Sequence, residues 1–324
     1  MKVLVTGSNG FVGSHIVEAL LENGYEVVCQ VRKTSNLRWL KGLNVKYFYG
    51  DVTDEKVLPE MVKGVDAIIH NAGLLRAIRK DDYYRVNQRA TRNIAEAVLR
   101  HNPRLKKFVY ISSQAAMGPC KALTPSDASG YEPPVSDYGL SKLAGENELK
   151  ILKGKIPCTI LRPASVYGPR DKDILLFFKL VNMGLRPSPL KERYTQLLFV
   201  KDLALAVVKS LQSRETDGKT YFLAEPKPYL WQDLGKTISE VMSRKTYLLP
   251  LPDFLFHLVA FFSEVVAYCF RTPATINRQK VREMRQCYWV GDATAAQKDM
   301  AMVFTNLKIG AKITYDWYLE NGWL

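Results

Sequence analysis

The sequence of 324 residues has little cysteine, and no apolar run in it reaches the ~20 residues that a membrane span needs. The five cysteines are odd in number and form no Cys-x-x-Cys pair, which argues against a disulfide framework and against a zinc site. Residues 1–7 are too short an apolar run for a signal peptide, and no small-residue cleavage site follows them. We therefore expect a protein of the reducing cytoplasm that holds no metal.

Acidic residues are also scarce. There are 32 of them against 46 lysines and arginines, which gives a formal net charge of +14. This excess suggests anionic partners, and a phosphate-bearing cofactor would account for only part of it. Charge alone leaves nucleic acid and an anionic membrane open. Binding to nucleic acid is not expected, because the sequence has neither an interleaved aromatic-basic patch nor a known nucleic-acid-binding module.

Internal repeats and low-complexity tracts are absent, and a hydrophobic content of 47% excludes wholesale disorder. Short β-rich runs instead alternate with helical runs. Because near-continuous apolar strands need cover on both faces, this alternation predicts an α/β fold with a doubly wound parallel sheet. Strands are expected at 2–6, 25–31, 45–49, 67–70, 107–112 and 158–162, and helices at 15–23, 88–101 and 141–153.

The alternation ends after residue 168, where prolines begin to cluster between helical runs. We expect a helix at 171–184, a strand at 196–200 and a helix at 201–212. The predicted organisation has a dinucleotide-binding domain formed by residues 1–169 and 196–224. A smaller, mostly helical substrate-binding region is formed by residues 170–195 and 225–324, and it covers the carboxyl edge of the sheet.

Residues 254–270 form the most apolar run, FLFHLVAFFSEVVAYCF. The run contains His257, Ser263 and Glu264 and is too short to span a membrane. Our first interpretation is a buried or groove-lining helix. The alternative is peripheral membrane contact over residues 254–285, aided by the basic stretch at 271–285.

A glycine-rich loop follows the first expected strand and leads into a helix. Gly7 can make the tight turn, Gly10 lets the backbone approach a pyrophosphate, and Gly13 allows close packing of helix and strand. The amide groups at the helix N-terminus would bind the phosphates. The alternative is a tight turn without a ligand. The expected dinucleotide contacts are Gly7, Asn9, Gly10, Phe11, Val12 and Gly13.

The end of the second expected strand lacks an acidic residue. An acid there would bind the ribose 2′-hydroxyl of NAD. The sequence instead offers Arg32, which could pair with a 2′-phosphate, with Lys33 and Ser35 assisting. NADP is therefore favoured and NAD stays possible, unless Arg32 and Lys33 merely continue the basic surface.

Tyr138 and Lys142 stand four residues apart and so are neighbours on one helical face. A phenol, with a pKa of about 10, is a poor acid or base at neutral pH. A close ammonium and the positive ring of an oxidised nicotinamide would lower that pKa. We expect Tyr138 to exchange a proton with a substrate oxygen during hydride transfer, and Lys142 to reach the ribose hydroxyls.

Together these motifs resemble those of the extended short-chain dehydrogenase/reductases, in the NAD-dependent epimerase/dehydratase superfamily. The segments Leu161–Pro169 and Phe199–Asp202 match this family as well. The resemblance implies a Rossmann domain with a bound dinucleotide, a variable C-terminal substrate region, and often a homodimer. It also implies Ser113 as the third catalytic residue, which holds the substrate oxygen beside Tyr138. Ser112 is the alternative, as a structural serine at a strand end.

The resemblance assigns further residues to the cofactor site. It implies that Asp51 and Val52 meet the adenine. It also implies that the cofactor lies against the backbone at residues 71–73, although Asn71 could equally be a turn residue. Asn87 would be structural. The remaining expected cofactor contacts are Ala72, Gly73, Pro163 and Val166, the last two bordering the nicotinamide.

Two departures bear on the substrate. Sugar-nucleotide members usually carry an asparagine where this sequence has Ser165, and often an arginine where it has Thr195, with Arg193 nearby but displaced. The sequence therefore resembles more the dihydroflavonol-reductase and 3β-hydroxysteroid-dehydrogenase-like branch, with residues 254–270 lining a hydrophobic substrate pocket. No acid pair accompanies Ser113, so dehydration is not expected.

The leading hypothesis is an NAD(P)-dependent oxidoreductase that interconverts an alcohol and a ketone on a moderately hydrophobic small molecule. The alternative is a nucleotide-sugar epimerase with tightly bound NAD. A dinucleotide sensor without catalysis is a third hypothesis, but a sensor has no need of Ser113, Tyr138 and Lys142 together.

Overall fold

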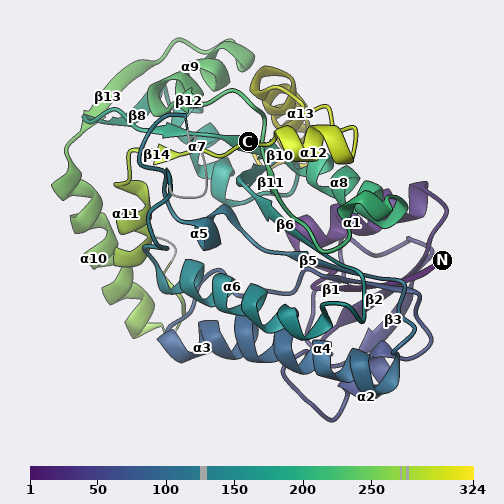
Figure 1. Cartoon of the computed structure of the whole chain (residues 1–324). Helices are drawn as coiled ribbons and strands as arrows, with labels where there is room; N and C mark the ends of the chain where they lie inside the picture. Colours follow the sequence, from purple (N-terminus) through teal and green to yellow (C-terminus); the bar gives the residue numbers. More distant parts are fainter. Residues whose placement is uncertain (125–129, 271, 275–276) are drawn as a thin grey trace.

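A seven-stranded parallel sheet forms the centre of the computed structural model, which describes residues 1–124, 130–270, 272–274 and 277–324 (Figure 1). The strand order is β11-β6-β5-β4-β1-β2-β3, so the expected doubly wound sheet is confirmed. The order reverses between β1 and β4, and the crevice outside their carboxyl ends is where such sheets bind ligands. The strands are β1 (Lys2–Thr6), β2 (Glu26–Val31), β3 (Lys46–Tyr49), β4 (Ala67–His70), β5 (Lys107–Ile111), β6 (Cys158–Pro163) and β11 (Thr220–Leu223).

Helices cover both faces of the sheet, which explains why its strands are apolar on both sides. Val3 and Val5 of β1 pack in one hydrophobic cluster with α1 (Phe11–Glu22) and α8 (Val200–Gln212). Leu4 points to the other face. There it packs in a second cluster with α2 (Leu58–Val62) and α4 (Ala90–His101), and α6 (Asp137–Glu148) lies beside α4.

The expected strands and helices of the first half are confirmed, with shifted ends. α1 begins at Phe11 instead of residue 15. α6 begins at Asp137 instead of residue 141, because the Ser136 hydroxyl caps it by accepting from the amide of Gly139 at 3.1 Å. The sequence analysis missed β11, which pairs in parallel with β6 at the sheet edge. Two short α-helices, α3 (Lys80–Tyr84) and α5 (Gln114–Met117), also lie in this part of the chain. A π-helical turn (Arg85–Arg89) precedes α4, and 3₁₀ turns are formed by Leu149–Leu152 after α6 and by Arg214–Thr216 after α8.

The region formed by residues 170–195 and 225–324 is mostly helical, as expected, but short strands also pair within it. β8 (Leu185–Pro189) pairs in parallel with β13 (Tyr247–Leu251), although β8 holds two prolines. The other short strands are β7 (Ser165–Tyr167) with β10 (Leu197–Phe199), and β9 (Tyr194–Thr195) with β12 (Tyr229–Leu230) and β14 (Tyr288–Trp289).

A third hydrophobic cluster holds α7 (Asp173–Asn182), α9 (Trp231–Val241) and α13 (Leu307–Glu320) together. α12 (Thr294–Asp299) packs with the α1 side of the sheet instead, through Ala296. The division of the chain into two domains stays a prediction.

Residues 254–270 lie in α10 (Asp253–Cys269) and its C-cap, followed by α11 (Arg278–Met284). Of the two forms of our first interpretation, the buried helix is wrong, because only Ala260 and Ala267 in α10 are buried, whereas a groove does run along the helix. Most of its large side chains are exposed, and the helix lies at the left-hand side of the molecule in Figure 1. Residues 271, 275 and 276 of the basic stretch lie outside the described residues. Among the helices of the described chain, none is both long and apolar enough to cross a bilayer.

Candidate active site

A cleft of about 990 Å³ opens at the carboxyl ends of the central strands. One wall comes from the glycine-rich loop after β1 and from the ends of β4, β5 and β6, and the opposite wall comes from the region after residue 169. Most of the predicted site residues line it: Gly7, Asn9, Gly10, Phe11, Val12, Gly13, Asn71, Ala72, Gly73, Ser113, Tyr138, Lys142, Pro163 and Val166.

The glycine-rich loop has the geometry of a phosphate cradle. Gly7 has a φ of +64°, which side-chain-bearing residues rarely adopt. A Cβ at Gly13 would lie 2.1 Å from the carbonyl oxygen of Gly7, so only glycine lets α1 approach the loop so closely. Gly10 is the N-cap of α1, no side chain caps this helix, and its first turn holds no acid. The amide groups of the first turn thus stay available for an anion at the cleft.

Residues 71–73 pass directly over the glycine-rich loop. The Thr6 hydroxyl accepts from the amides of Asn71 and Ala72 at 3.1 and 3.0 Å. The Asn71 side chain donates to the carbonyl oxygen of Gly7 at 3.2 Å. Asn71 therefore ties the end of β4 to the loop, and since it also lines the cleft, its expected contact with the cofactor stays a prediction. Gly73 keeps the backbone slim beside Lys142, whose Nζ a Cβ would approach to 3.5 Å.

Four predicted cofactor contacts are not brought to the cleft wall. Arg32, Lys33, Asp51 and Val52 are absent from the described residues that line the cleft. The carboxylate of Asp51 accepts from the amide and hydroxyl of Thr53 at 2.9 and 2.8 Å. Burial alone would raise the pKa of Asp51, but these hydrogen bonds, together with the charges of Arg32 and Arg85, hold it below its usual range.

The sequence analysis missed Arg38 and Trp39, which line the same end of the cleft. The Arg38 guanidinium lies 4.1 Å from the centre of the Trp39 ring, and Arg170 approaches that ring to 4.9 Å. Arg38 is six residues beyond Arg32, and the sequence carries no signal that separates the two. Only the path of the loop after β2 turns Arg38 toward the cleft.

Ser113, Tyr138 and Lys142 converge at the end of β5. Ser113 is the N-cap of α5, and its hydroxyl accepts from the amide of Ala115 at 3.1 Å. Tyr138 lies in the first turn of α6 and hydrogen-bonds to Ser113. Lys142 is buried one turn later, where its Nζ donates to the carbonyl oxygen of Ile111 at 2.6 Å.

The pKa values of this group depart from the expectation. Burial raises the pKa of Tyr138 to about 12, although the hydrogen bond with Ser113 lowers it. Burial lowers the pKa of Lys142 to about 7, although the nearby Glu146 raises it. The expected lowering of the Tyr138 pKa by Lys142 is therefore not produced by the protein's own groups, because the desolvated amine holds its charge weakly and is directed at Ile111.

Ser112 has a different partner from Ser113. Its hydroxyl donates to Glu146, which also accepts from Arg162 at 2.9 and 2.6 Å. Ser112 is therefore part of a hydrogen-bond network with Glu146 and Arg162, whereas Ser113 lies beside Tyr138. Asn87 is structural, as expected: it exchanges hydrogen bonds with the backbone of Leu74 and donates to the Ser141 hydroxyl at 2.9 Å.

The opposite wall of the cleft is mostly apolar. The expectation that residues 254–270 line this pocket is wrong, because no described residue of α10 reaches it. Gln114 donates to Ser165 at 3.1 Å, and both residues line the cleft together with Ser113, Tyr138 and Lys142. Arg193 is buried in the wall next to Thr195 and pairs with Asp253 at the start of α10. The apolar side chains are Ile174, Leu176, Phe177, Phe178, Leu180, Leu197, Leu203, Trp231, Leu234, Ile238, Met284, Trp289, Leu307 and Ala311.

The sheet order, the glycine cradle and the Ser113, Tyr138 and Lys142 group define an extended short-chain dehydrogenase/reductase. The model of the NAD dependent epimerase/dehydratase family matches residues 3–224, and the chain belongs to this family. Its members are enzymes that include reductases, dehydrogenases and epimerases.

Three similar proteins span nearly the whole chain. A ceramide reductase of Caulobacter vibrioides is 28% identical over 99% of this chain and 96% of its own length. A sterol-4-alpha-carboxylate 3-dehydrogenase (decarboxylating) of Candida albicans is 23% identical over 99% of this chain and 98% of its own. The structure of UDP-glucose 4-epimerase from Thermus thermophilus in complex with NAD superposes with a TM-score of 0.77, at 21% identity, and covers 98% of this chain and 99% of that one.

Proposed function

We propose that this protein is an NADP-dependent oxidoreductase that interconverts an alcohol and a ketone on a moderately hydrophobic small molecule. The observation that carries the proposal is the hydrogen-bonded pair of Ser113 and Tyr138, which faces a largely apolar cleft wall. The lipid substrates in the names of the ceramide reductase and the sterol dehydrogenase support an apolar substrate.

The residues present fit a dinucleotide. The uncapped start of α1 and the slim backbone at Gly7 and Gly10 would hold the pyrophosphate. For the 2′-phosphate we propose Arg32, as the sequence suggests, together with Arg38, which lines the cleft. The lack of an acid at the end of β2 supports NADP over NAD.

The side chains have separate roles in this proposal. A bound nicotinamide cofactor supplies or accepts the hydride, and its oxidised ring would favour the phenolate of Tyr138. In the direction of reduction, the Tyr138 hydroxyl gives its proton to the substrate oxygen as charge develops there. The Ser113 hydroxyl donates to the same oxygen and holds it in place. Lys142, fixed by Ile111, orients the ribose beside them.

The test is a Tyr138→Phe variant assayed for NADPH oxidation with a panel of aliphatic and cyclic ketones. We expect turnover to fall by at least about 100-fold, because the proton donor is gone. NADPH binding, measured by fluorescence, should stay within a few-fold. Tyr83→Phe is the matched control, because the Tyr83 ring lies 6.4 Å from that of Tyr138 yet faces no proposed substrate oxygen. An unimpaired Tyr138→Phe enzyme would refute the mechanism.

A nucleotide-sugar epimerase is the second candidate. Arg193 favours it, because this buried guanidinium lines the cleft and its Nε has no partner among the described residues. Mass spectrometry of the nucleotide released on denaturation separates the two functions. Retained NAD, with no NADPH consumed with any ketone, would favour the epimerase.

A further inference from the structure

Helix α10 exposes most of its large apolar side chains, whereas its two carboxylates, Asp253 and Glu264, are directed toward the protein. The inward side includes Asp253, Phe256, Ala260, Glu264 and Ala267. The side chains exposed on α10 and its C-cap include Phe254, Leu258, Val259, Phe261, Phe262, Val265, Val266, Tyr268 and Phe270, and Phe262 is 57% and Tyr268 84% exposed. This is the reverse of the usual arrangement of a helix at a protein surface.

Ion pairs hold the helix in this orientation. Asp253 at its start pairs with Arg193 of the cleft wall and with Arg285. Glu264 in its middle accepts from the amide of Arg278 at 2.7 Å and pairs with the guanidinium of the same residue at 3.0 Å. The outward face is therefore fixed by defined contacts to three basic residues, and rotation of the helix would break them.

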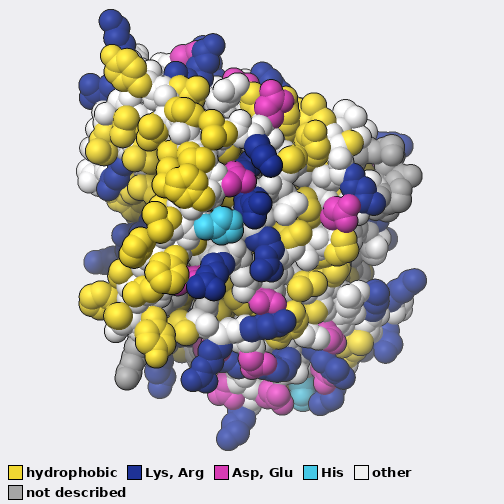
Figure 2. All heavy atoms as spheres, turned by 90° about the vertical axis from the view of Figure 1, so that its left-hand side faces the viewer, with side chains coloured by type: hydrophobic (Ala, Val, Ile, Leu, Met, Phe, Trp, Pro, Cys, Tyr) yellow, Lys and Arg dark blue, Asp and Glu magenta, His cyan; other side chains and the backbone are white. Residues whose placement is uncertain are grey.

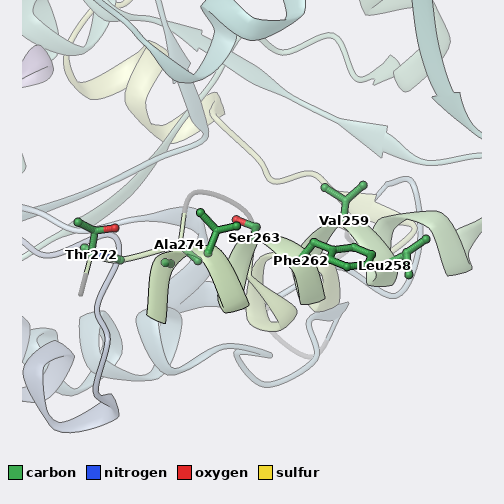
Figure 3. Close-up of a pocket in the computed structure, with 9 residues that line it drawn as sticks. Leu258, Val259, Phe262, Ser263, Thr272 and Ala274 are labelled. Atoms are coloured by element: carbon green, nitrogen blue, oxygen red, sulfur yellow. The ribbon is translucent and has the colours of Figure 1, made fainter. Parts of the chain in front are cut away.

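The apolar surface extends beyond the helix. A groove of about 520 Å³ runs between α10 and residues 272–274, lined by Leu258, Val259, Phe262, Ser263, Val266 and Ala267 from the helix (Figure 3). β13 leads directly into α10 and adds Tyr247, Leu248 and Leu249, all exposed. Contiguous apolar patches of this kind mark contact with another apolar phase or molecule.

Basic side chains border this surface. Figure 2 shows a band of hydrophobic side chains with lysine and arginine side chains beside it. Arg278, Arg282 and Arg285 of α11 and its C-cap are exposed next to α10. The formal charge of the whole chain is +14. An apolar helix face flanked by arginines is complementary to the acyl chains and phosphate groups of an anionic bilayer.

We propose that α10 is an interfacial helix that lies in the plane of a bilayer containing anionic lipid, with its outward face among the acyl chains. At 17 residues, with Asp253 and Glu264 tied to arginines, it is suited to lie on the membrane and not to cross it. The neighbouring helix α11 contributes Lys280, Glu283 and Met284 to the cleft wall. If the proposed function holds, an apolar substrate would thus reach the cleft from the adjoining bilayer.

The experiment is flotation of the full-length protein with phosphatidylcholine vesicles that either contain or lack phosphatidylglycerol. We expect the protein to float with the anionic vesicles and to partition at least about tenfold less after the double substitution Phe262→Asp and Val266→Asp. Val303→Asp is the matched control, because Val303 is 84% exposed outside α10 and should leave flotation unchanged. Arg282→Glu should weaken flotation with the vesicles that contain phosphatidylglycerol and leave flotation with pure phosphatidylcholine vesicles unchanged, because it removes a positive charge.

Circular dichroism checks that the double variant keeps its fold, and a polarity-sensitive dye on the exposed thiol of Cys269 reports directly whether α10 enters the bilayer. The proposal is overturned if the wild type does not float, or if the double variant floats equally well. A third outcome would also overturn it: light scattering finds a dimer, the dimer does not bind vesicles, and the double substitution converts it to monomers. In that case α10 would pack against a second copy of this chain. None of these readouts needs turnover, so their failure leaves the oxidoreductase proposal standing.

Discussion

The Nζ atom of Lys142 lies 2.6 Å from the carbonyl oxygen of Ile111, the last residue of β5. This bond ties the first turns of α6 to the end of β5, two residues before Ser113. It explains how a hydroxyl from one part of the chain and a phenol 25 positions later come to share one hydrogen bond. The bond also keeps Lys142 buried, and burial lowers its pKa to about 7.

Replacing Lys142 by methionine should lower turnover by about 100-fold, because the anchor of the ribose and of α6 is lost. The free energy of unfolding of this variant should also depend on pH differently from that of the wild type. In the wild type, the pKa of Lys142 drops from 10.5 in the unfolded chain to about 7 in the folded one, so the unfolded chain binds more protons between these values.

The free energy of unfolding of the wild type, relative to Lys142→Met, should therefore rise as the pH increases from 7 to 10.5. Urea titrations of both proteins across this range measure the difference. A difference that does not change with pH would contradict the burial of a weakly charged amine at this position.

Two glycines of the phosphate cradle should respond differently to alanine. In Gly13→Ala the added methyl would lie 2.1 Å from the carbonyl oxygen of Gly7. We therefore expect the free energy of unfolding to fall by about 2 kcal/mol, and NADPH binding to be lost as well. In Gly10→Ala the nearest contact is 3.4 Å and φ is −77°, so the fold should be unaffected. NADPH affinity should still fall by about tenfold or more, because the methyl faces the pyrophosphate. Thermal unfolding and fluorescence titration separate the two effects, and equal behaviour of the two variants would argue against the cradle.

Glu146→Gln should destabilise the protein, because it leaves the partly buried Arg162 without its carboxylate partner. We expect a loss of about 2–3 kcal/mol in urea unfolding. Glu96→Gln is the control, since Glu96 pairs with Arg92 and Arg100 at the exposed surface and its loss should hardly change stability. A Glu146→Gln protein as stable as Glu96→Gln would show that the Ser112, Glu146 and Arg162 network adds nothing to folding.

His15 should make the protein sensitive to mild acid. Burial lowers its pKa from 6.5 to about 4, although its contact with the Pro169 carbonyl oxygen, at 2.9 Å, acts in the opposite direction. The unfolded chain then binds more protons than the folded one between these values, so the stability that His15 contributes is lost as the pH falls from 6.5 to 4. His15→Gln, which can still donate to Pro169, should lose less stability over this range. Parallel pH-dependent slopes for wild type and variant would contradict this assignment.

Motifs that act within one strand–turn–helix unit were predictable from the sequence. The spacing of Gly7, Gly10 and Gly13 and that of Tyr138 and Lys142 are set by local backbone geometry, so the cradle and one face of α6 could be inferred. Arg32 and Arg38 show the limit, since both follow β2 and only the path of the loop brings Arg38 to the cleft. β11 could not be predicted, because a strand of four residues is too short for its hydrophobic pattern to separate it from a loop.

The sequence by itself determined the parallel sheet, because strands that are apolar on both sides can be stable only with helices on both faces. It also determined which residues are catalytic candidates. Only the tertiary structure decided whether the apolar side chains of residues 254–270 are buried or exposed. An apolar pattern states that side chains avoid water, but not whether they turn to the core or away from it. Ion pairs of Asp253 with Arg193 and of Glu264 with Arg278 hold the polar side of that run against the protein and leave its large apolar side chains outside.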